Sequence, residues 1–270
     1  MEGRGYEMNV MEIENAARHA WPAIEEEELS FGVLRYSRGT DRRTNSLSLY
    51  LDVEFETDKL IDAAEKFFAE RDAVPIVRIV HQDGVELDSI AQIDSALERR
   101  GYKKQSSSLS ILLDLESPLQ TKASASNSSI EKVDAESWLQ TWYTLTNRNF
   151  QKIDVHKTLF EKSKLAHQFL LKQGVNGVPL SSGMAVYENH AMGLFGISTA
   201  SGQRKKGYAL DIINSLLCWG SARGARFAYL QVDEANFVAV NLYQKLGFKK
   251  SYSYWYRVGE YKARNREART

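Results

Sequence analysis

The stretch "VDEANFVAVNLYQKLGF", residues 232–248, predicts a helix between two strands. The helix covers "NFVAVNLYQKLG" and ends at Gly247, because glycine tolerates the left-handed conformation that closes many helices. Strand-like segments flank it, "RFAYLQV" before and "FKKSYSYWYRV" after. A further helix begins after Gly207, where small or apolar residues recur at helical spacing: Ala209, Ile212, Ile213, Leu216 and Gly220. Helices that alternate with strands favour an α/β fold with a mixed sheet.

The segments before this region extend the pattern. "AESWLQTWYTLTNRNF" (135–150) and "HKTLFEKSKLAHQFLLKQG" (156–174) are interpreted as helices, the second closed by Gly174. "SGMAVYENHAMGLFGIST" (182–199) predicts two strands joined by a tight turn at Glu188-Asn189-His190.

The first half of the chain repeats the order of the second. "ALERRGYKKQSSSLSILL" (96–113) parallels residues 242–258, and residues 59–80 parallel residues 209–232. Two matches in the same order indicate an internal duplication. The small, polar stretch "TKASASNSS" is typical of a linker. We therefore expect four parts: a degenerate copy (1–120), a linker (121–130), a catalytic domain (131–258) and a basic tail (259–270).

Composition limits the class of protein. The 270 residues carry no net charge, yet residues 1–120 hold 14 Lys+Arg against 24 Asp+Glu, and residues 121–270 hold 21 against 11. Such asymmetry suggests different partners for the two halves, or two complementary halves. The single cysteine, Cys218, allows no disulfide within the chain, and no apolar run is long enough to span a bilayer. We expect a cytoplasmic protein with no membrane partner, no metal site and no nucleic-acid motif. The sequence leaves the oligomeric state open.

The stretch "SGQRKKGYALDI", residues 201–212, places three cations and a glycine at the start of the helix that follows Gly207. A helix N-terminus exposes unpaired N–H groups and the positive end of the helix dipole. A glycine there lets the backbone approach a ligand, and flanking cations strengthen the attraction for phosphate. Taken alone, the loop fits a solvated basic turn better than a phosphate site, and the rest of the chain must decide.

Together the two stretches resemble the GNAT superfamily of acyl-CoA-dependent N-acetyltransferases. The loop Arg204-Lys205-Lys206-Gly207-Tyr208-Ala209 resembles the family's Arg/Gln-x-x-Gly-x-Gly/Ala, and residues 232–248 match its Val-x-x-x-Asn-x-x-Ala-x-x-Leu-Tyr-x-Lys-x-Gly-Phe. The resemblance covers roughly residues 131–258. It implies a sheet whose fourth and fifth strands splay apart around the pantetheine arm of coenzyme A, with acetyl-CoA as cosubstrate. It also implies these cofactor-binding residues: Ile197, Ser198 and Thr199 for the pantetheine amides, Arg204, Lys205, Lys206, Gly207, Tyr208 and Ala209 for the pyrophosphate, and Asn236 near the next helix.

The resemblance further implies that Tyr243 is the general acid that protonates the departing thiolate. We expect Tyr243 to lie on a helix whose buried stripe contains Val238, Leu242 and Leu246. The N–H donor for the acetyl oxygen is expected near Ile197. No base is assigned for the incoming amine: the carboxylates and histidine nearest in sequence, Glu188, His190, Asp233 and Glu234, all fall in turns.

The leading interpretation is an N-acetyltransferase that acts on a primary amine, either a small molecule or a protein amino group. A non-catalytic acetyl-CoA-binding regulatory module and an acyltransferase with another acyl donor are the alternatives. In the first half, Asp52, Glu54, Glu56 and Asp58 replace the phosphate loop, so we expect no cofactor site there. That half either contributes to binding the amine acceptor or is only a scaffold. Its loop with Arg38, Arg42 and Arg43 suits an acceptor carboxylate equally well.

Overall fold

The structure is a computed structural model that describes residues 8–51, 53–85, 88–116 and 129–261. The chain forms two compact units, each assembled from separate segments. Unit 1 comprises Met1–Pro22, Ser110–Val232 and Asn236–Lys250. Unit 2 comprises Ala23–Leu109, Asp233–Ala235 and Ser251–Thr270. Among the described helices, none has the length and apolarity needed to cross a membrane.

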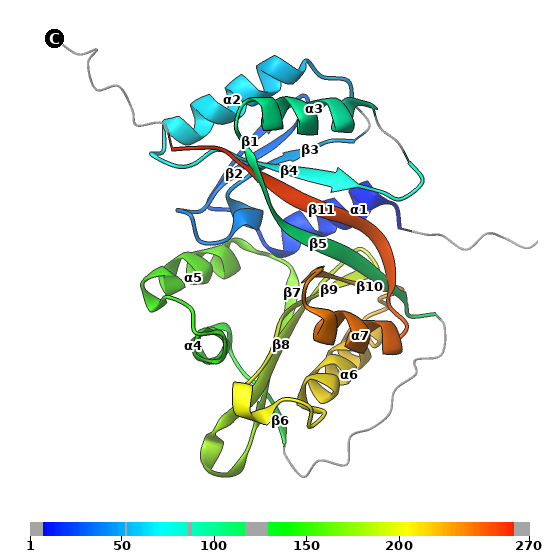
Figure 1. Ribbon diagram of the computed structural model, residues 1–270. Helices are drawn as coiled ribbons and strands as arrows, with labels where there is room; N and C mark the ends of the chain where they lie inside the picture. Colours follow the sequence, from blue (N-terminus) through cyan, green and yellow to red (C-terminus); the bar gives the residue numbers. More distant parts are fainter. Residues whose placement is uncertain (1–7, 52, 86–87, 117–128, 262–270) are drawn as a thin grey trace, which may run out of the picture. The chain divides into compact units, whose positions relative to one another are not determined.

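Unit 1 is built on a mixed sheet with strand order β10-β9-β8-β7-β6 (Figure 1). The strands are β6 (Ile130–Lys132), β7 (Ala166–Gln173), β8 (Pro179–Glu188), β9 (Ala191–Thr199) and β10 (Phe227–Asp233). Neighbours from β6 to β9 are antiparallel, whereas β9 and β10 are parallel. The turn between β8 and β9 has the predicted form, because Asn189 and His190 both adopt positive φ, as two-residue hairpin turns require.

Helices pack on both faces of this sheet (Figure 1). They are α1 (Val10–Ala20), α4 (Ala135–Thr146), α5 (Ile153–Lys162), α6 (Tyr208–Ser221) and α7 (Phe237–Lys245). On the α6 face, Gly183 and Gly220 make room for Ile212 and Met192. On the α4 face, the rings of Trp138 and Trp142 stack with centroids 5.2 Å apart. Trp21, which ends α1, packs edge-on to Trp142 at 5.9 Å, so the N-terminal helix belongs to the core of unit 1.

Unit 2 is built on a sheet with strand order β1-β2-β3-β4-β11. The strands are β1 (Glu25–Leu29), β2 (Gly32–Tyr36), β3 (Leu47–Leu49), β4 (Ile76–His81) and β11 (Lys249–Val258). The β2–β3 pair is antiparallel and the β3–β4 pair is parallel, which repeats the directions of β8–β9 and β9–β10 in unit 1. The two halves therefore share strand directions as well as sequence pattern, as a duplication predicts.

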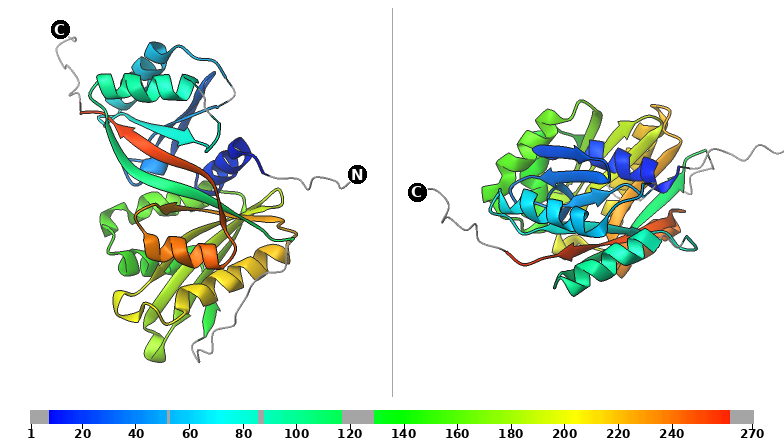
Figure 2. Two further views of the ribbon diagram at one scale, coloured as in Figure 1. Left: turned by 45° about the vertical axis from the view of Figure 1, so that its right-hand side comes forward. Right: turned by 90° about the horizontal axis from the view of Figure 1, so that it is seen from above.

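Helices α2 (Thr57–Ala69) and α3 (Asp88–Arg99) cover one face of the sheet of unit 2 (Figure 2). Their apolar stripes meet inward-facing strand residues such as Leu47, Val77 and Ile79, all fully buried. Burial of such side chains contributes roughly 1.5–3 kcal/mol each. The degenerate half thus keeps a complete core of its own.

Part of the last strand of each half belongs to the other unit. β11 pairs antiparallel with β4, from Ser253 opposite His81 to Val258 opposite Ile76 (Figure 2). Residues 110–114 of β5 (Lys103–Asp114) belong to unit 1, where β5 neighbours β10 and Leu115 N–H donates to Arg226 O over 2.8 Å. The four predicted parts follow the repeat in the sequence and stay a prediction. Their bounds are 1–120, 121–130, 131–258 and 259–270. Most of the linker and tail lies outside the described residues.

One predicted helix is wrong. Residues 156–174 form the end of α5 and then β7, with extended backbone at Ser163 (φ −76°, ψ 124°) ending the helix. The alternation of β7 was hidden because Gln168 and Lys172 are buried polar residues, and Leu170 and Leu171 are both buried. An apolar run without visible alternation does not distinguish a strand from a helix.

Candidate functional site

Strand β9 carries a bulge next to the residues predicted to bind pantetheine. Ser182 pairs with Ser198 but Met184 pairs with Phe195, so Gly196 and Ile197 together oppose the single residue Gly183. Gly196 has φ +58°, and an added Cβ would lie 2.5 Å from the ring of Trp138. Only glycine fits this position, and the bulge redirects the strand from Ile197 onward.

Strands β9 and β10 separate after a short stretch of pairing. Their pairing runs from Ala191 and Phe227 to Gly193 and Tyr229, while β9 continues to Thr199. The carbonyl of Ser198 accepts from Ser181 Oγ over 2.6 Å on the β8 side. Ile197, Ser198 and Thr199 thus lie on the part of β9 beyond the parallel ladder, where the resemblance requires them. Their contact with pantetheine stays a prediction.

The loop after β9 alternates between positive and negative φ. Lys205 and Gly207 have φ of +63° and +84°, whereas Lys206 between them and Tyr208 after them are not in the left-handed region. Such alternation turns successive N–H groups toward one side, the geometry of an anion-binding nest. Arg204, Lys205 and Lys206 are exposed, and Lys206 Nζ donates to Gln203 Oε1 over 2.7 Å.

Helix α6 continues this loop. Its first backbone bond runs from Asp211 N–H to Gly207 O over 3.0 Å. The N–H groups of Tyr208, Ala209 and Leu210 precede that bond and have no acceptor within the helix. All residues of the predicted pyrophosphate loop, from Arg204 to Ala209, therefore lie at one helix N-terminus.

Tyr243 lies on α7 and is 6% exposed. Burial raises the pKa of its hydroxyl above the ordinary value for tyrosine, so the phenol keeps its proton at neutral pH. Its ring packs edge-on to Phe248 at 5.6 Å. The expected stripe was wrong in one member, because Val238 is 73% exposed. Asn236 is the N-cap of α7, where its Oδ1 accepts from Ala239 N–H over 3.2 Å.

The carboxylates considered as bases have structural partners. Glu188 Oε1 lies 3.0 Å from His19 Nδ1, and His190 Nδ1 lies 3.3 Å from Gly224 O. Glu188 ends β8 and His190 lies in the turn before β9, so both are far along the strand from Thr199, the last residue of β9. Asp233 Oδ1 accepts from Ala235 N–H over 2.8 Å and so closes a turn. The base remains unassigned.

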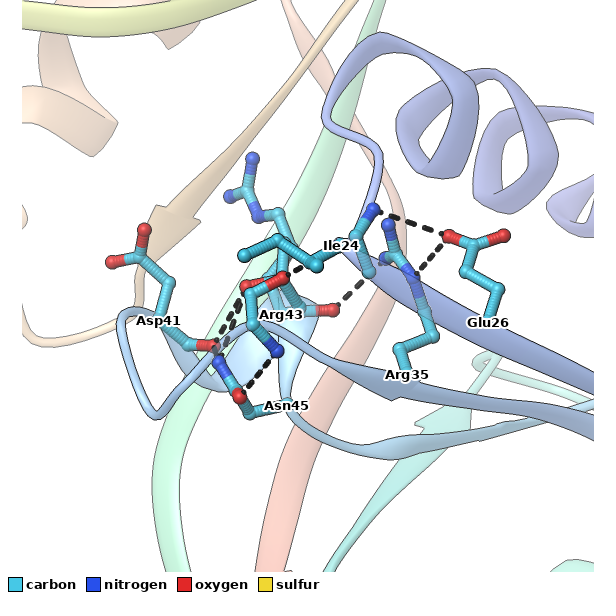
Figure 3. Close-up of polar contacts among 9 residues, drawn as sticks. Ile24, Glu26, Arg35, Asp41, Arg43 and Asn45 are labelled. Carbon is cyan, nitrogen blue, oxygen red and sulfur yellow. Dashed lines mark hydrogen bonds and ion pairs between the residues drawn. The ribbon is translucent and has the colours of Figure 1, made fainter. Parts of the chain in front are cut away.

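The arginine loop of unit 2 is built around a buried asparagine (Figure 3). Asn45 Oδ1 accepts from the N–H groups of Ser37 and Gly39, at 2.8 and 2.9 Å, while its Nδ2 donates to Asp41 O. Arg35 is 3% exposed and bridges Glu26 and the carbonyl of Arg43, each at 2.9 Å. These contacts give the loop a fixed backbone.

The N-terminus of α2 occupies the place in unit 2 that the phosphate loop and α6 occupy in unit 1. Glu56 pairs with Lys59 at 2.6 Å, and Asp58 pairs with Arg100 at 2.8 Å. Asp52 lies outside the described residues. A cavity of about 500 Å³ opens beside this end of the helix. It is lined by Thr57, Asp58, Asp88, Ala91, Gln92, Ser95, Ala96 and Arg99. Carboxylates here oppose a polyanion, and the loss of the cofactor site in this half stays a prediction.

Comparison with known proteins gives the family. A family model described as "Probable histone acetyltransferase Rv0428c C-terminal" matches residues 8–257. The chain belongs to this acetyltransferase family. The acetyltransferase is 23% identical over 252 residues to the Bacillus subtilis (strain 168) protein "Uncharacterized N-acetyltransferase YobR", which covers 93% of this chain and 98% of that one.

Solved structures share the fold of the acetyltransferase. The GCN5-related N-acetyltransferase from Kribbella flavida superposes with a TM-score of 0.65 at 13% identity, covering 97% of this chain and 100% of its own. A tandem GNAT protein from the clavulanic acid biosynthesis pathway gives 0.64 at 10% identity, covering 92% and 87%. The predicted GNAT resemblance and mixed α/β fold are confirmed, and the protein is an acyl-CoA-dependent N-acetyltransferase.

Two features of the site had no sequence signal that we used. The packing of α1 against β8 and β9 joins Trp21 to Phe195, whose rings lie 5.6 Å apart. Lys172 and Asp211 form a buried ion pair at the start of α6. The position of Lys172 directly after the apolar residues of "FLLKQG" is a sequence signal that could have pointed to this buried ion pair.

Proposed function

We propose that the acetyltransferase moves the acetyl group of acetyl-CoA to a primary amine in a ternary complex. The observation that carries the proposal is the loop from Arg204 to Gly207, whose alternating φ and exposed cations meet the N-terminus of α6. The proposal assigns each part of the donor to one part of the chain: the pyrophosphate to this loop, pantetheine to the separated end of β9, and the sulfur to Tyr243. A cytoplasmic location belongs to the proposal and is supported by the single cysteine.

The roles of the donor-binding residues follow from their backbone. The N–H groups from Arg204 to Ala209 donate to phosphate oxygens, and the three cations add attraction at the rim. Backbone groups of Ile197, Ser198 and Thr199 pair with the pantetheine amides. Asn236 Oδ1 is used by the helix cap, so its Nδ2 is the atom that donates toward coenzyme A.

The chemical step requires an acid and an oxyanion donor. The amine nitrogen attacks the thioester carbonyl, the C–N bond forms, and the C–S bond breaks after the tetrahedral intermediate. An N–H group near Ile197 stabilises the negative oxygen, and the Tyr243 hydroxyl gives its proton to the leaving sulfur. The amine loses its proton to an acceptor that the described residues do not assign.

We further propose that residues of unit 2 bind the acceptor and that the acceptor is cationic. Support comes from the acidic end of α2 beside the cavity. Asp58 and Glu56 are exposed by 82% and 72%, and exposed ion pairs bind weakly, so both carboxylates remain available to an incoming cation. The family description mentions histone acetylation, which makes a lysine side chain one candidate acceptor.

The experiment that tests the function is a screen of amines and lysine peptides that follows release of free thiol. Acetyl-, propionyl- and succinyl-CoA are compared as donors, and acetyl-CoA is expected to give the highest kcat/KM. Binding of acetyl-CoA without turnover across the whole panel would contradict amine transfer. A clear preference for a longer acyl group would contradict the donor.

The acceptor site is then tested with the variant Glu54→Gln/Glu56→Gln/Asp58→Asn. We expect a higher acceptor KM at low salt, an unchanged acetyl-CoA KM, and a difference that fades with added salt. Glu27→Gln, an exposed carboxylate on β1, is the matched control. If neither KM changes, unit 2 is a scaffold.

A further inference from the structure

A buried ion pair lies at the first turn of α6. Lys172 Nζ, on β7, is 2.6 Å from Asp211 Oδ2, and the two side chains are 2% and 10% exposed. Burial of two charges is costly, and such a pair is weak evidence for stability because apolar residues of similar volume often serve as well. A pair kept at this position therefore suggests a role in the site beside it.

Asp211 connects this pair to the phosphate loop. Its backbone N–H donates to Gly207 O over 3.0 Å while its side chain holds Lys172. Lys172 Nζ also lies 5.5 Å from the centroid of the Tyr208 ring. One ammonium group thus contacts the first and fourth residues of α6, Tyr208 and Asp211.

The same lysine reaches the end of β9 through its cross-strand neighbour. Lys172 pairs with Ser181, and Ser181 Oγ contacts Ser198 O at 2.6 Å and Thr199 Oγ1 at 3.1 Å. Lys172 thus contacts the start of α6 through its side chain, whereas its link to the end of β9 runs through backbone pairing with Ser181.

The charges of Lys172 and Asp211 affect how strongly the start of α6 attracts an anion. A carboxylate in the first turn of a helix is favourable to the helix dipole but unfavourable to an anion bound at the same N-terminus. The ammonium of Lys172 neutralises Asp211, so the helix end stays attractive to phosphate. Without it, an unpaired buried carboxylate would remain in the first turn of the helix that begins at the loop.

We propose that Lys172 is a positioning residue for the phosphates of the acyl-CoA donor, acting through Asp211. The inference rests on the proposed donor site. Lys172 holds the first turn of α6 in place and cancels the charge that would otherwise repel the donor. Its removal should raise the KM for acetyl-CoA while kcat changes little, because the reacting atoms are not touched.

The test compares four full-length variants: Lys172→Met, Lys172→Arg, Asp211→Asn and the double variant Lys172→Met/Asp211→Asn. Affinity for coenzyme A is measured by calorimetry, and the melting temperature is measured without ligand. Lys172→Met should weaken binding at least 10-fold. Lys172→Arg should stay within 3-fold of wild type, Asp211→Asn should bind as well or better, and the double variant should recover most of the loss.

The matched control is Arg257→Met, which breaks another ion pair with a buried cation, Arg257 with Asp94 at 2.7 Å in unit 2. It should lower the melting temperature without changing coenzyme A affinity. Wild-type affinity in Lys172→Met overturns the inference, as does a double variant no better than Lys172→Met. If Lys172→Met does not fold, the other two variants decide. The inference is overturned if Lys172→Arg binds coenzyme A more than 3-fold more weakly than wild type, or if the double variant binds weakly as well. Failure of the wild type to bind coenzyme A contradicts the proposed function instead.

Discussion

Replacement of Gly207 by glutamate should remove donor binding for two reasons, backbone strain and charge repulsion, which control variants can distinguish. Gly207 has φ +84°, a conformation that costs an L-residue about 1–2 kcal/mol. The added carboxylate would also repel a pyrophosphate bound at the proposed loop: two unit charges of like sign about 5 Å apart repel by about 3 kcal/mol at an effective dielectric of 20. The electrostatic part alone predicts a loss of about 10²-fold in coenzyme A affinity.

Gly101 provides the control for backbone strain. It also has φ +84°, ends α3 in unit 2, and leaves open space around an added Cβ. Gly101→Glu should therefore show the same loss of stability in thermal unfolding but no loss of coenzyme A affinity in calorimetry. Gly207→Ala, which has the strain without the charge, should bind with an intermediate affinity. The reasoning is refuted if Gly207→Glu binds coenzyme A within 3-fold of wild type.

Three further predictions use other parts of the molecule. Tyr243→Phe should lower kcat about 10²-fold with little change in acetyl-CoA affinity. Because burial raises the pKa of Tyr243, wild-type kcat should show no loss from pH 7 to 10. If single-turnover kinetics show an unchanged rate of the chemical step in Tyr243→Phe, Tyr243 is a core residue and not the general acid. Titration calorimetry should give one coenzyme A site per chain, and two equivalent sites would contradict the loss of the site in unit 2. Burial pushes the pKa of Asp94 up, but hydrogen bonds from Arg257 and Trp255 hold it below the ordinary value; its stabilisation is thus present above about pH 4 and lost as pH falls through the lowered pKa. Asp94→Asn should therefore cost about 1.5–3 kcal/mol in denaturant unfolding at pH 7 and much less at pH 2.

Features encoded by neighbouring residues could be predicted from the sequence. The turn at Asn189-His190, the start of α6 after Gly207 and the end of α7 at Gly247 each depend on a few adjacent side chains. Tyr243 was found because it lies within a motif of seventeen residues, 232–248. These signals are local, so a single chain carries them without knowledge of its fold.

Features that depend on distant pairing could not be predicted. Lys172 and Asp211 are 39 residues apart, and nothing in either neighbourhood specifies the other. β7 was missed because its buried lysine is satisfied by a partner on α6 rather than by water. Val238 was assigned to the core from spacing alone, although α7 turns that residue to solvent. In each case a tertiary contact, or its absence, overrides the local pattern.

The exchange of last strands has a consequence for how the protein is made. Unit 2 cannot complete its sheet until β11 has left the ribosome, because β4 pairs with residues 253–258, which are synthesised long after it. Until then β4 presents an unpaired edge, which is a template for aggregation. Contacts so far apart in sequence also slow folding. Cutting the gene at the predicted linker would thus separate β11 from β4 and residues 110–114 of β5 from the rest of unit 1. The halves of this duplication are no longer separable modules: synthesis, folding and degradation act on the whole chain.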